Sequence, residues 1–364
     1  MSQRRSLVSI ILATRNEAAH IRPCMASLLS QDAPELDLEI LAVDGLSNDG
    51  TREFLEQTAA QDPRVKVLLN ERKRQPCAFN LGLREARGEF VCIFGSHTLY
   101  KKDYVAVCLR ELIAKEAVGC GGRVVTQASV DTLQARLVAS ALAHPFGSSQ
   151  KSFRTQLEGF ADNVNYMVIR KQPLIDVGGY DEQLTRNEDN DTNQKLRARG
   201  HKLFCTWKTQ CIYHPKQTIW DLLVYAFRNG FWNVICLKEN PDSMGARYFA
   251  PSLFVSGLLS AFLIAAAGIF MAQPLRALSA FPLVALLLLH LGLGTLASVQ
   301  VFRRERYLGS LWLPPVFFGF HFAYGLGTLF AFVTRAKVQV PGSVRRKDRA
   351  QARAPGEPTG ISAG

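Results

Sequence analysis

The sequence lacks the cysteine patterns of disulfide-rich secreted domains and of zinc sites. Its eight cysteines include no CxxC pair and no paired histidine spacing. We therefore expect reduced thiols in a cytosolic environment rather than a disulfide framework. The cysteines are Cys24, Cys77, Cys92, Cys108, Cys120, Cys205, Cys211 and Cys236.

Phosphate-binding fingerprints are also missing. No GxGxxG run follows the first apolar segment, and no GxxxxGK(S/T) run occurs in the chain. These absences argue against a dinucleotide-binding Rossmann domain and against a P-loop nucleotidase.

Acidic residues are too few to balance the basic ones, and the formal net charge is +12 at pH 7. Residues 301–364 alone hold ten Lys and Arg against three Asp and Glu, and most of this excess flanks apolar segments. Anionic lipid headgroups are the nearest acidic partner for such cations, so we expect membrane lipids and no nucleic acid. The cations in question are Arg303, Arg304, Arg306 and those within 345–353.

Apolar residues make up 48% of the chain and gather toward its C-terminal part. Three stretches, 249–272, 278–301 and 308–334, each exceed the ~20 helical residues that cross a bilayer. If all three cross and the N-terminal half is cytosolic, the basic tail falls outside, against the positive-inside rule. Pro314-Pro315 and the glycines after them leave a re-entrant third segment open.

Upstream, short β-rich runs alternate with amphipathic stretches. The first run imitates a signal peptide, but its seven apolar residues are too few, and we read it as a buried strand. The alternation predicts an α/β fold with a doubly wound, mostly parallel sheet. The expected strands are 7–13, 38–43, 65–69 and 90–94, followed in turn by helices at 18–30, 51–61, 76–86 and 103–115.

Weaker patterns complete the expected organisation. Residues 129–164 are expected to form loops over the carboxyl edge of the sheet, where α/β proteins bind ligands. Later elements are a strand at 164–170, a turn at Gly178-Gly179, a helix at 189–199 and strands at 202–206 and 210–213. The expected domains are a soluble domain over 1–217, an amphipathic interface helix and linker over 218–248, a membrane region over 249–334, and a disordered basic tail over 335–364.

Polar residues follow the first, second and fourth expected strands, at 14–17, 44–51 and 95–98. Helix capping by Ser47, Asn48 or Asp49 explains part of the second group without any ligand. In order and spacing, however, several runs resemble the nucleotide-sugar half of family 2 glycosyltransferases: VSIILATRNE at 8–17, VDGLSNDGT at 43–51, NLG at 80–82 and ARGEF at 86–90. VGGYDE at 177–182 and RNED at 186–189 resemble the acceptor half. The chain is most similar to the succinoglycan-type exopolysaccharide glucosyltransferases.

The resemblance implies a GT-A fold that binds a UDP-sugar. It assigns uracil recognition to Asp44 and the nucleoside lining to the loop after the first strand. A carboxylate can accept the uracil imide N–H, and backbone donors at helix starts suit a diphosphate. The implied donor residues are Thr14, Arg15, Asn16, Glu17, Asp44, Asn80 and Ser96. Arg72 and Lys73 are weaker candidates, because a solvated face explains them as well.

Inverting transfer needs a base that deprotonates the acceptor hydroxyl as it attacks the anomeric carbon. The resemblance assigns this role to Asp189, with Glu188 as the other member of the family's acidic pair. Glu188 and Asp191 are close alternatives, since any acid in this run can instead serve as an N-terminal helix charge.

The chain departs from the family where members carry Asp-x-Asp for a divalent cation, because Gly95-Ser96-His97 stands there. His97 can ligate Mn²⁺ but suits Mg²⁺ poorly, and His214 is a second candidate ligand. Metal dependence is therefore left open. Without metal, the charge of the leaving group must be neutralised by helix dipoles and by cations such as Arg72, Arg123 or Arg228.

For the acceptor, the resemblance and the position near the membrane indicate His144, Arg154, Arg228 and Trp232. The family's processive synthases carry Gln-x-x-Arg-Trp near this place, but Tyr225 occupies the Gln position. Processive polymer synthesis is therefore not expected, and a plain membrane-interface helix explains the same segment.

These observations predict an inner-membrane enzyme with a cytosolic catalytic domain. It would transfer a hexose from a UDP-sugar to a lipid-linked saccharide during cell-surface polysaccharide synthesis. The rival is a non-catalytic membrane scaffold that lost metal-dependent transfer with the acid at position 95, although a scaffold needs no base at Asp189. A transporter is disfavoured because the apolar segments hold few ionisable residues.

Overall fold

A computed structural model of the chain describes residues 5–243 and 245–334. The basic tail expected over 335–364, with its cluster at 345–353, lies outside the described residues.

The soluble part is built on one sheet, in the order β3-β2-β1-β4-β8-β6-β9-β5, with β7 paired to β9. The first four strands in this order are parallel, and β8 is antiparallel to both neighbours. The strands are β1 (Ser6–Thr14), β2 (Leu36–Asp44), β3 (Val65–Leu69), β4 (Phe90–Gly95), β5 (Thr98–Tyr100), β6 (Gly119–Thr126), β7 (Gly159–Phe160), β8 (Val168–Arg170) and β9 (Leu203–Tyr213). The mixed, mostly parallel α/β sheet confirms the expected fold class.

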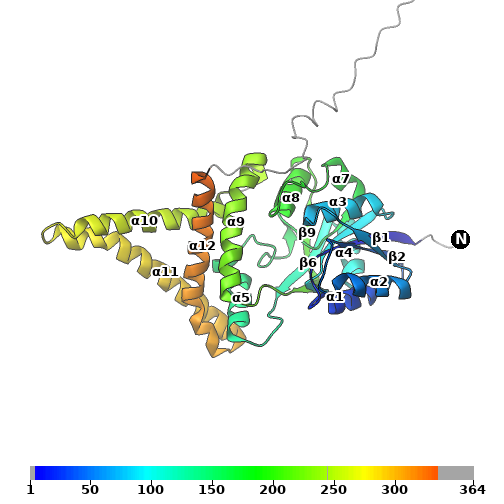
Figure 1. The fold of residues 1–364 in the computed structure, drawn as a ribbon, viewed down its shortest axis with the longest axis horizontal. Coiled ribbons are helices and arrows are strands. Elements are labelled where there is room, and N and C mark those ends of the chain that lie inside the picture. Colours follow the sequence, from blue (N-terminus) through cyan, green and yellow to red (C-terminus); the bar gives the residue numbers. More distant parts are fainter. Residues whose placement is uncertain (1–4, 244, 335–364) are drawn as a thin grey trace, which may run out of the picture.

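Helices cover both faces of this sheet (Figure 1). Val8, Ile10 and Leu12 of β1 pack into one apolar core, while Ile11 packs into a second core on the other face. Burial on both faces explains why this strand is almost purely apolar. The helices of the expected first half are α1 (Ile21–Leu29), α2 (Thr51–Gln61), α3 (Gln75–Glu85) and α4 (Tyr104–Ala114), which confirms the expected alternation.

The segment expected to be loops is partly helical. It contains α5 (Leu133–Ala143), the short α6 (Pro145–Ser148) and β7. Apolar residues of α5, including Leu137 and Leu142, pack against Phe317 of a C-terminal helix, so tertiary burial supplies the stability that local pattern did not indicate. The two strands expected at 202–206 and 210–213 are the single strand β9, and the strand expected at 164–170 is shortened to β8. No strand was expected at β5 or β6.

The helices α7 (Lys171–Asp176), α8 (Glu188–Ala198) and α9 (Ile219–Glu239) complete this part. The three apolar stretches form α10 (Ala250–Gly268), α11 (Leu275–Glu305) and α12 (Leu313–Val333), with 3-10 turns at η1 (Pro241–Ser243), η2 (Ala246–Phe249) and η3 (Leu308–Trp312). Each of the three helices is long and apolar enough to cross a membrane. Figure 1 shows α10 and α11 as a projecting hairpin, whereas α12 lies beside α9.

Candidate active site

A cavity of about 1330 Å³ lies between the carboxyl edge of the sheet, the start of α8, helix α9 and the base of the C-terminal helices. Its lining joins segments from Glu17 near the N-terminus to Phe330 near the end of α12. The cavity therefore connects the soluble domain with the apolar helices.

Two adjacent carboxyl groups, Glu188 and Asp189, line this cavity at the first turn of α8. Asn187 precedes them with a left-handed backbone (φ 64°), a conformation that asparagine tolerates better than most residues. The side-chain amide of Asn165 donates a hydrogen bond to Oδ2 of Asp189. Asn165 was not among the expected site residues, because its place within the expected strand 164–170 gave no signal of a role.

Burial controls the protonation of this pair. Burial raises the pKa of Glu188 to about 8, and the neighbouring charge of Asp189 adds to the shift. Burial also raises the pKa of Asp189, while the Asn165 hydrogen bond and Arg154 oppose the shift. Two such groups cannot both ionise easily, so the pair retains a proton up to higher pH than isolated carboxyls do.

Asp191, the other acidic alternative, points elsewhere. Its carboxylate pairs with Lys195 one turn along α8 and accepts a 2.7 Å hydrogen bond from Asn240. It is 1% exposed and does not line the cavity. Its structural partners account for it, and only Glu188 and Asp189 of the acidic run remain at the cavity.

Besides Arg247, which lies 3.6 Å from Asp162, four Lys and Arg side chains line the cavity: Arg154, Arg186, Lys216 and Arg228. In the part of the chain that the structure describes, none of them has a carboxylate within 4.0 Å. Such a group of positive charges favours an anionic ligand.

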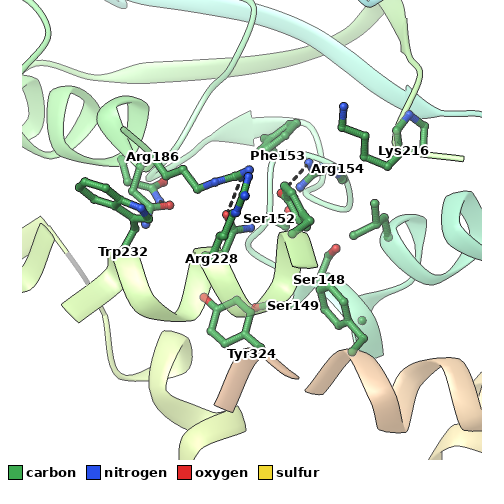
Figure 2. Close-up of a pocket in the computed structure, with 18 of the residues that line it drawn as sticks. Ser148, Ser149, Ser152, Phe153, Arg154, Arg186, Lys216, Arg228, Trp232 and Tyr324 are labelled. Atoms are coloured by element: carbon green, nitrogen blue, oxygen red, sulfur yellow. Dashed lines mark hydrogen bonds between the residues drawn. The ribbon is translucent and has the colours of Figure 1, made fainter. Parts of the chain in front are cut away.

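Neutral partners hold two of these cations in place, as Figure 2 shows. Nη1 of Arg186 donates a 3.0 Å hydrogen bond to Oδ1 of Asn229. Nη2 of Arg154 donates to the Tyr225 hydroxyl at 3.2 Å. Arg154 and Arg228 were expected acceptor residues, whereas Arg186 and Lys216 were not proposed as site residues. Lys216 follows β9 closely, so the rule about strand ends could have found it.

Of the two other expected acceptor residues, one lines the cavity and one does not. Trp232 lines the cavity. His144 does not, because its Nδ1 accepts a 3.1 Å hydrogen bond from the backbone N–H of Phe146 and its Nε2 lies 2.9 Å from Oε1 of Gln300 in α11. His144 therefore caps α6 and joins it to α11.

The two histidines expected at a metal site, His97 and His214, lie just after β4 and β9. Nδ1 of His97 is 3.6 Å from Oε1 of Glu17, and the backbone N–H of His214 donates to the backbone oxygen of His97 at 3.1 Å. Nδ1 of His214 contacts the backbone oxygen of Gln127 at 2.9 Å. Among the described residues, no three His, Cys, Asp or Glu side chains gather to hold a metal ion. Glu17 and His97 lie close enough together that they would be the two protein ligands of a divalent cation bound here.

The ring of Tyr166 lies close to Gly95, which stands where the family carries its first acid. A Cβ atom on Gly95 would lie 3.3 Å from Cε1 of Tyr166, which is tighter than ordinary contact. The Tyr166 ring therefore occupies the space into which the family's first acid would project.

The expected donor residues are close in the fold, but only Glu17 lines the cavity. Asp44 is fully buried, and its carboxylate accepts hydrogen bonds from the Ser47 backbone (3.0 Å) and hydroxyl (2.5 Å). Thr14 and Ser96 are buried, and Oδ1 of Asn16 accepts a hydrogen bond from the Asn48 backbone at 3.1 Å.

The remaining donor candidates make structural contacts. Nη1 of Arg15 donates to the Lys73 backbone oxygen at 3.3 Å. The side chain of Asn80 accepts a 2.9 Å hydrogen bond from the backbone N–H of Tyr180 and donates a 2.8 Å hydrogen bond to its backbone oxygen. These two bonds connect α3 to the turn after α7. Arg72 pairs with Glu182. Arg123 stacks 4.5 Å over the Trp207 ring, outside the cavity.

Comparison with known proteins agrees with this arrangement. The family model described as "Glycosyl transferase family 2" matches residues 9–178. The chain is 30% identical over 226 residues to the succinoglycan biosynthesis protein ExoA of Rhizobium meliloti (strain 1021), covering 61% of this chain and 67% of that protein. A second relative, of Methanococcus voltae, is 25% identical over 277 residues (70% of this chain, 83% of the relative) and is named a dolichyl N-acetyl-alpha-D-glucosaminyl phosphate 3-beta-D-2,3-diacetamido-2,3-dideoxy-beta-D-glucuronosyltransferase.

Among solved structures, the mannosyltransferase PcManGT from Pyrobaculum calidifontis, in complex with GDP-Man and Mn²⁺, superposes with a TM-score of 0.54. The match covers 90% of this chain and 88% of that one at 19% identity, so it supports the fold alone. With a GT-A type sheet and a carboxyl pair at its carboxyl edge, this chain belongs to glycosyltransferase family 2 and is a glycosyltransferase.

Proposed function

We propose that this chain is a membrane-anchored, inverting glycosyltransferase that transfers a hexose from a UDP-sugar to a lipid-linked saccharide in cell-surface polysaccharide synthesis. One observation carries the proposal: a single cavity is lined by the carboxyl pair, by residues of the apolar helices, and by four basic side chains that have no carboxylate within 4.0 Å among the described residues. A saccharide joined through phosphate to an apolar chain has matching chemistry along its length.

Asp189 acts as the base in this proposal. Its ionised carboxylate accepts the proton of the acceptor hydroxyl, whose oxygen attacks the anomeric carbon while the bond from that carbon to the UDP oxygen breaks. The products are the extended acceptor, UDP carrying the bonding electron pair, and protonated Asp189. Asn165 donates to Asp189 and therefore favours its charged form, which supports Asp189 over Glu188.

The donor would lie at the N-terminal strand ends, near Glu17 and His97. Thr14, Arg15, Asn16, Asn80 and Ser96 would support the nucleotide side of this site. In this structure the Asp44 carboxylate accepts a hydrogen bond from the Ser47 hydroxyl. To recognise uracil, Asp44 would give up this bond and accept one from the imide N–H instead.

A divalent cation fits the donor end with two protein ligands, Glu17 and His97. The Mn²⁺ named with the mannosyltransferase of the same fold supports this assignment. The ion would neutralise diphosphate charge on the departing nucleotide. Lys216 and Arg154 would add positive charge nearby whether or not an ion binds.

The acceptor would lie toward α9, with its anionic group near Arg186, Arg228 and Trp232. The names of the two relatives, one for succinoglycan biosynthesis and one for a dolichyl phosphate substrate, support a lipid-linked saccharide. Residues 1–217 would form the catalytic domain on the cytosolic side of the plasma membrane, 218–248 the interface helix and linker, and 249–334 the membrane region.

The test is UDP release by the full chain, purified in detergent, from a panel of UDP-sugars with membrane lipid extract. Asp189→Asn is expected to reduce the rate at least a hundredfold, because general base catalysis contributes roughly 10²–10⁴-fold. Asp176→Asn is the matched control, since Asp176 is exposed on α7 away from the cavity. Absence of release and of UDP binding with every donor would overturn the proposal and favour the scaffold.

A further inference from the structure

We propose that only α10 and α11 cross the bilayer, and that α12 lies along the membrane surface beneath the catalytic domain. The end of α12 at Val333 then lies on the catalytic side. The inference rests on where the two ends of α12 lie and on what its polar face binds, and it does not depend on the donor or acceptor of the reaction.

Both ends of α12 lie at the base of the α10–α11 hairpin. At its start, the Ser298 hydroxyl near the end of α11 donates to the backbone oxygen of Ser310 at 2.8 Å. At its end, the ring of Phe332 lies 6.5 Å from that of Phe249, directly before α10. A spanning helix would instead end near the hairpin tip, where α10 meets α11. Figure 1 shows α12 running across the base of the hairpin.

One face of α12 carries polar side chains that bond to α6 and α9 and, through His321, also to His290 of α11. His321 Nε2 lies 2.9 Å from the backbone oxygen of Phe146, and the Thr328 hydroxyl donates to the Gly230 oxygen at 3.2 Å. Between them, the Tyr324 hydroxyl accepts a hydrogen bond from Asn233 of α9. The spacing of these three residues places them on one side of a helix.

Contacts with α9 determine how deeply α12 can lie in the membrane. The two helices lie side by side in the same direction: a Cβ on Gly319 would meet Leu223, and one on Gly327 would meet the oxygen of Phe227. Helix α9 carries Asp221 and Arg228 and lines the active-site cavity. Because charged groups are excluded from the hydrocarbon core, α9 must stay at the surface, and α12 must stay with it.

Beyond its base, the hairpin differs from α12 in lying apart from the sheet and its helices (Figure 1). Its middle and tip expose large apolar side chains, including Phe262, Leu263, Phe270 and Leu288. Arg276 is the sole Asp, Glu, Lys or Arg between Phe249 and Phe302. The 23-residue stretch 246–268 spans about 34 Å as a helix, enough for a hydrocarbon core of about 30 Å.

This arrangement also satisfies the positive-inside rule. Arg247 stands before α10, and Arg303 and Arg304 lie in the last turn of α11, so the base of the hairpin is basic. With two spans, the seven Lys and Arg of residues 335–364 fall on that same side. With three spans, they would fall on the opposite side.

The test is labelling of single introduced cysteines in the full chain with a membrane-impermeant maleimide, in sealed vesicles of both orientations. Ala60→Cys marks the catalytic side, Ala272→Cys the hairpin tip and Thr334→Cys the end of α12; all three positions are exposed. The unchanged chain is the control, because its eight cysteines are buried. Solubilised membranes give the full label for each variant.

We expect Thr334→Cys to label from the same side as Ala60→Cys, and Ala272→Cys from the other side, with at least a tenfold preference in each case. Labelling of Thr334→Cys together with Ala272→Cys would show three spans and overturn the proposal. Labelling of all three variants from one side would show that the hairpin does not cross, and would overturn it as well.

Discussion

The side-chain amide of Asn187 donates a 2.7 Å hydrogen bond to Oδ1 of Asn233. Asn187 directly precedes the carboxyl pair, and Asn233 in turn donates to the Tyr324 hydroxyl of α12. A chain of three polar side chains thus joins the start of α8 to α9 and to the C-terminal helices. The position of the carboxyl pair is therefore tied to the apolar C-terminal helices.

Removing Asn233 is expected to disturb both ends of this chain. Asn233 is 1% exposed, so Asn233→Ala leaves buried polar partners unsatisfied and should lower the free energy of unfolding by about 1–3 kcal/mol. Tyr324→Phe removes one hydroxyl and should cost about 0.5–1.5 kcal/mol. Denaturation in detergent measures both, and Tyr324→Phe should have little further effect in the Asn233→Ala background. Fully additive costs would show that the two residues do not interact.

Glu188 is expected to make stability depend on pH. Burial raises its pKa from 4.5 to about 8, so the folded state holds this proton more tightly than the unfolded state. The resulting stabilisation is complete below pH 4.5 and is lost as pH rises toward 8. Glu188→Gln should therefore gain thermal stability relative to the unchanged chain between pH 5 and 8. Parallel Tm curves for the two proteins would contradict a raised pKa.

Arg186 and Arg228, which have no carboxylate within 4.0 Å among the described residues, are expected to act on the acceptor. Arg186→Ala and Arg228→Ala should each raise the KM for an anionic acceptor about tenfold, equivalent to about 1.4 kcal/mol, with a smaller effect on the KM for the donor. Arg110→Ala is the control, because Arg110 is exposed on α4 and outside the cavity. High salt should weaken acceptor binding in the unchanged chain. An equal rise in both KM values would place these cations elsewhere in the reaction.

Metal dependence should act through His97. If Glu17 and His97 hold Mn²⁺, His97→Ala should raise the Mn²⁺ concentration for half-maximal activity at least tenfold, since each ligand contributes strongly to affinity. His201→Ala, outside the cavity, should leave it unchanged. Activity that persists in EDTA in the unchanged chain would show instead that cations alone assist departure of UDP.

The contact between α9 and α12 depends on glycine. A Cβ on Gly230 would lie 2.0 Å from the backbone oxygen of Tyr324, so Gly230→Ala must force the two helices apart. We expect the free energy of unfolding to fall by about 1–3 kcal/mol, the usual cost of overpacking a core. Gly292→Ala in α11 is the matched control, because nothing lies within 4 Å of its added methyl. Equal stability of the two variants in detergent denaturation would show that α9 and α12 do not pack this closely.

Local pattern in the sequence determined much of the fold. The apolar runs of β1 to β4 and the helices between them follow from periodicity, because strand and helix faces repeat at fixed intervals. The three apolar helices follow from length and composition alone. Glu188 and Asp189 were found because the family resemblance marks a short run of consecutive residues.

Tertiary structure decided which of the candidates meet. Asp189 and Asp191 are two positions apart on α8, yet one faces the cavity and the other pairs with Lys195, because a helix turns by about 200° over two residues. Arg154, Arg186 and Lys216 converge from segments far apart in the chain, and no local signal records such a meeting. Hydropathy likewise gives the length of α12 but not its direction, which its contacts with α9 set.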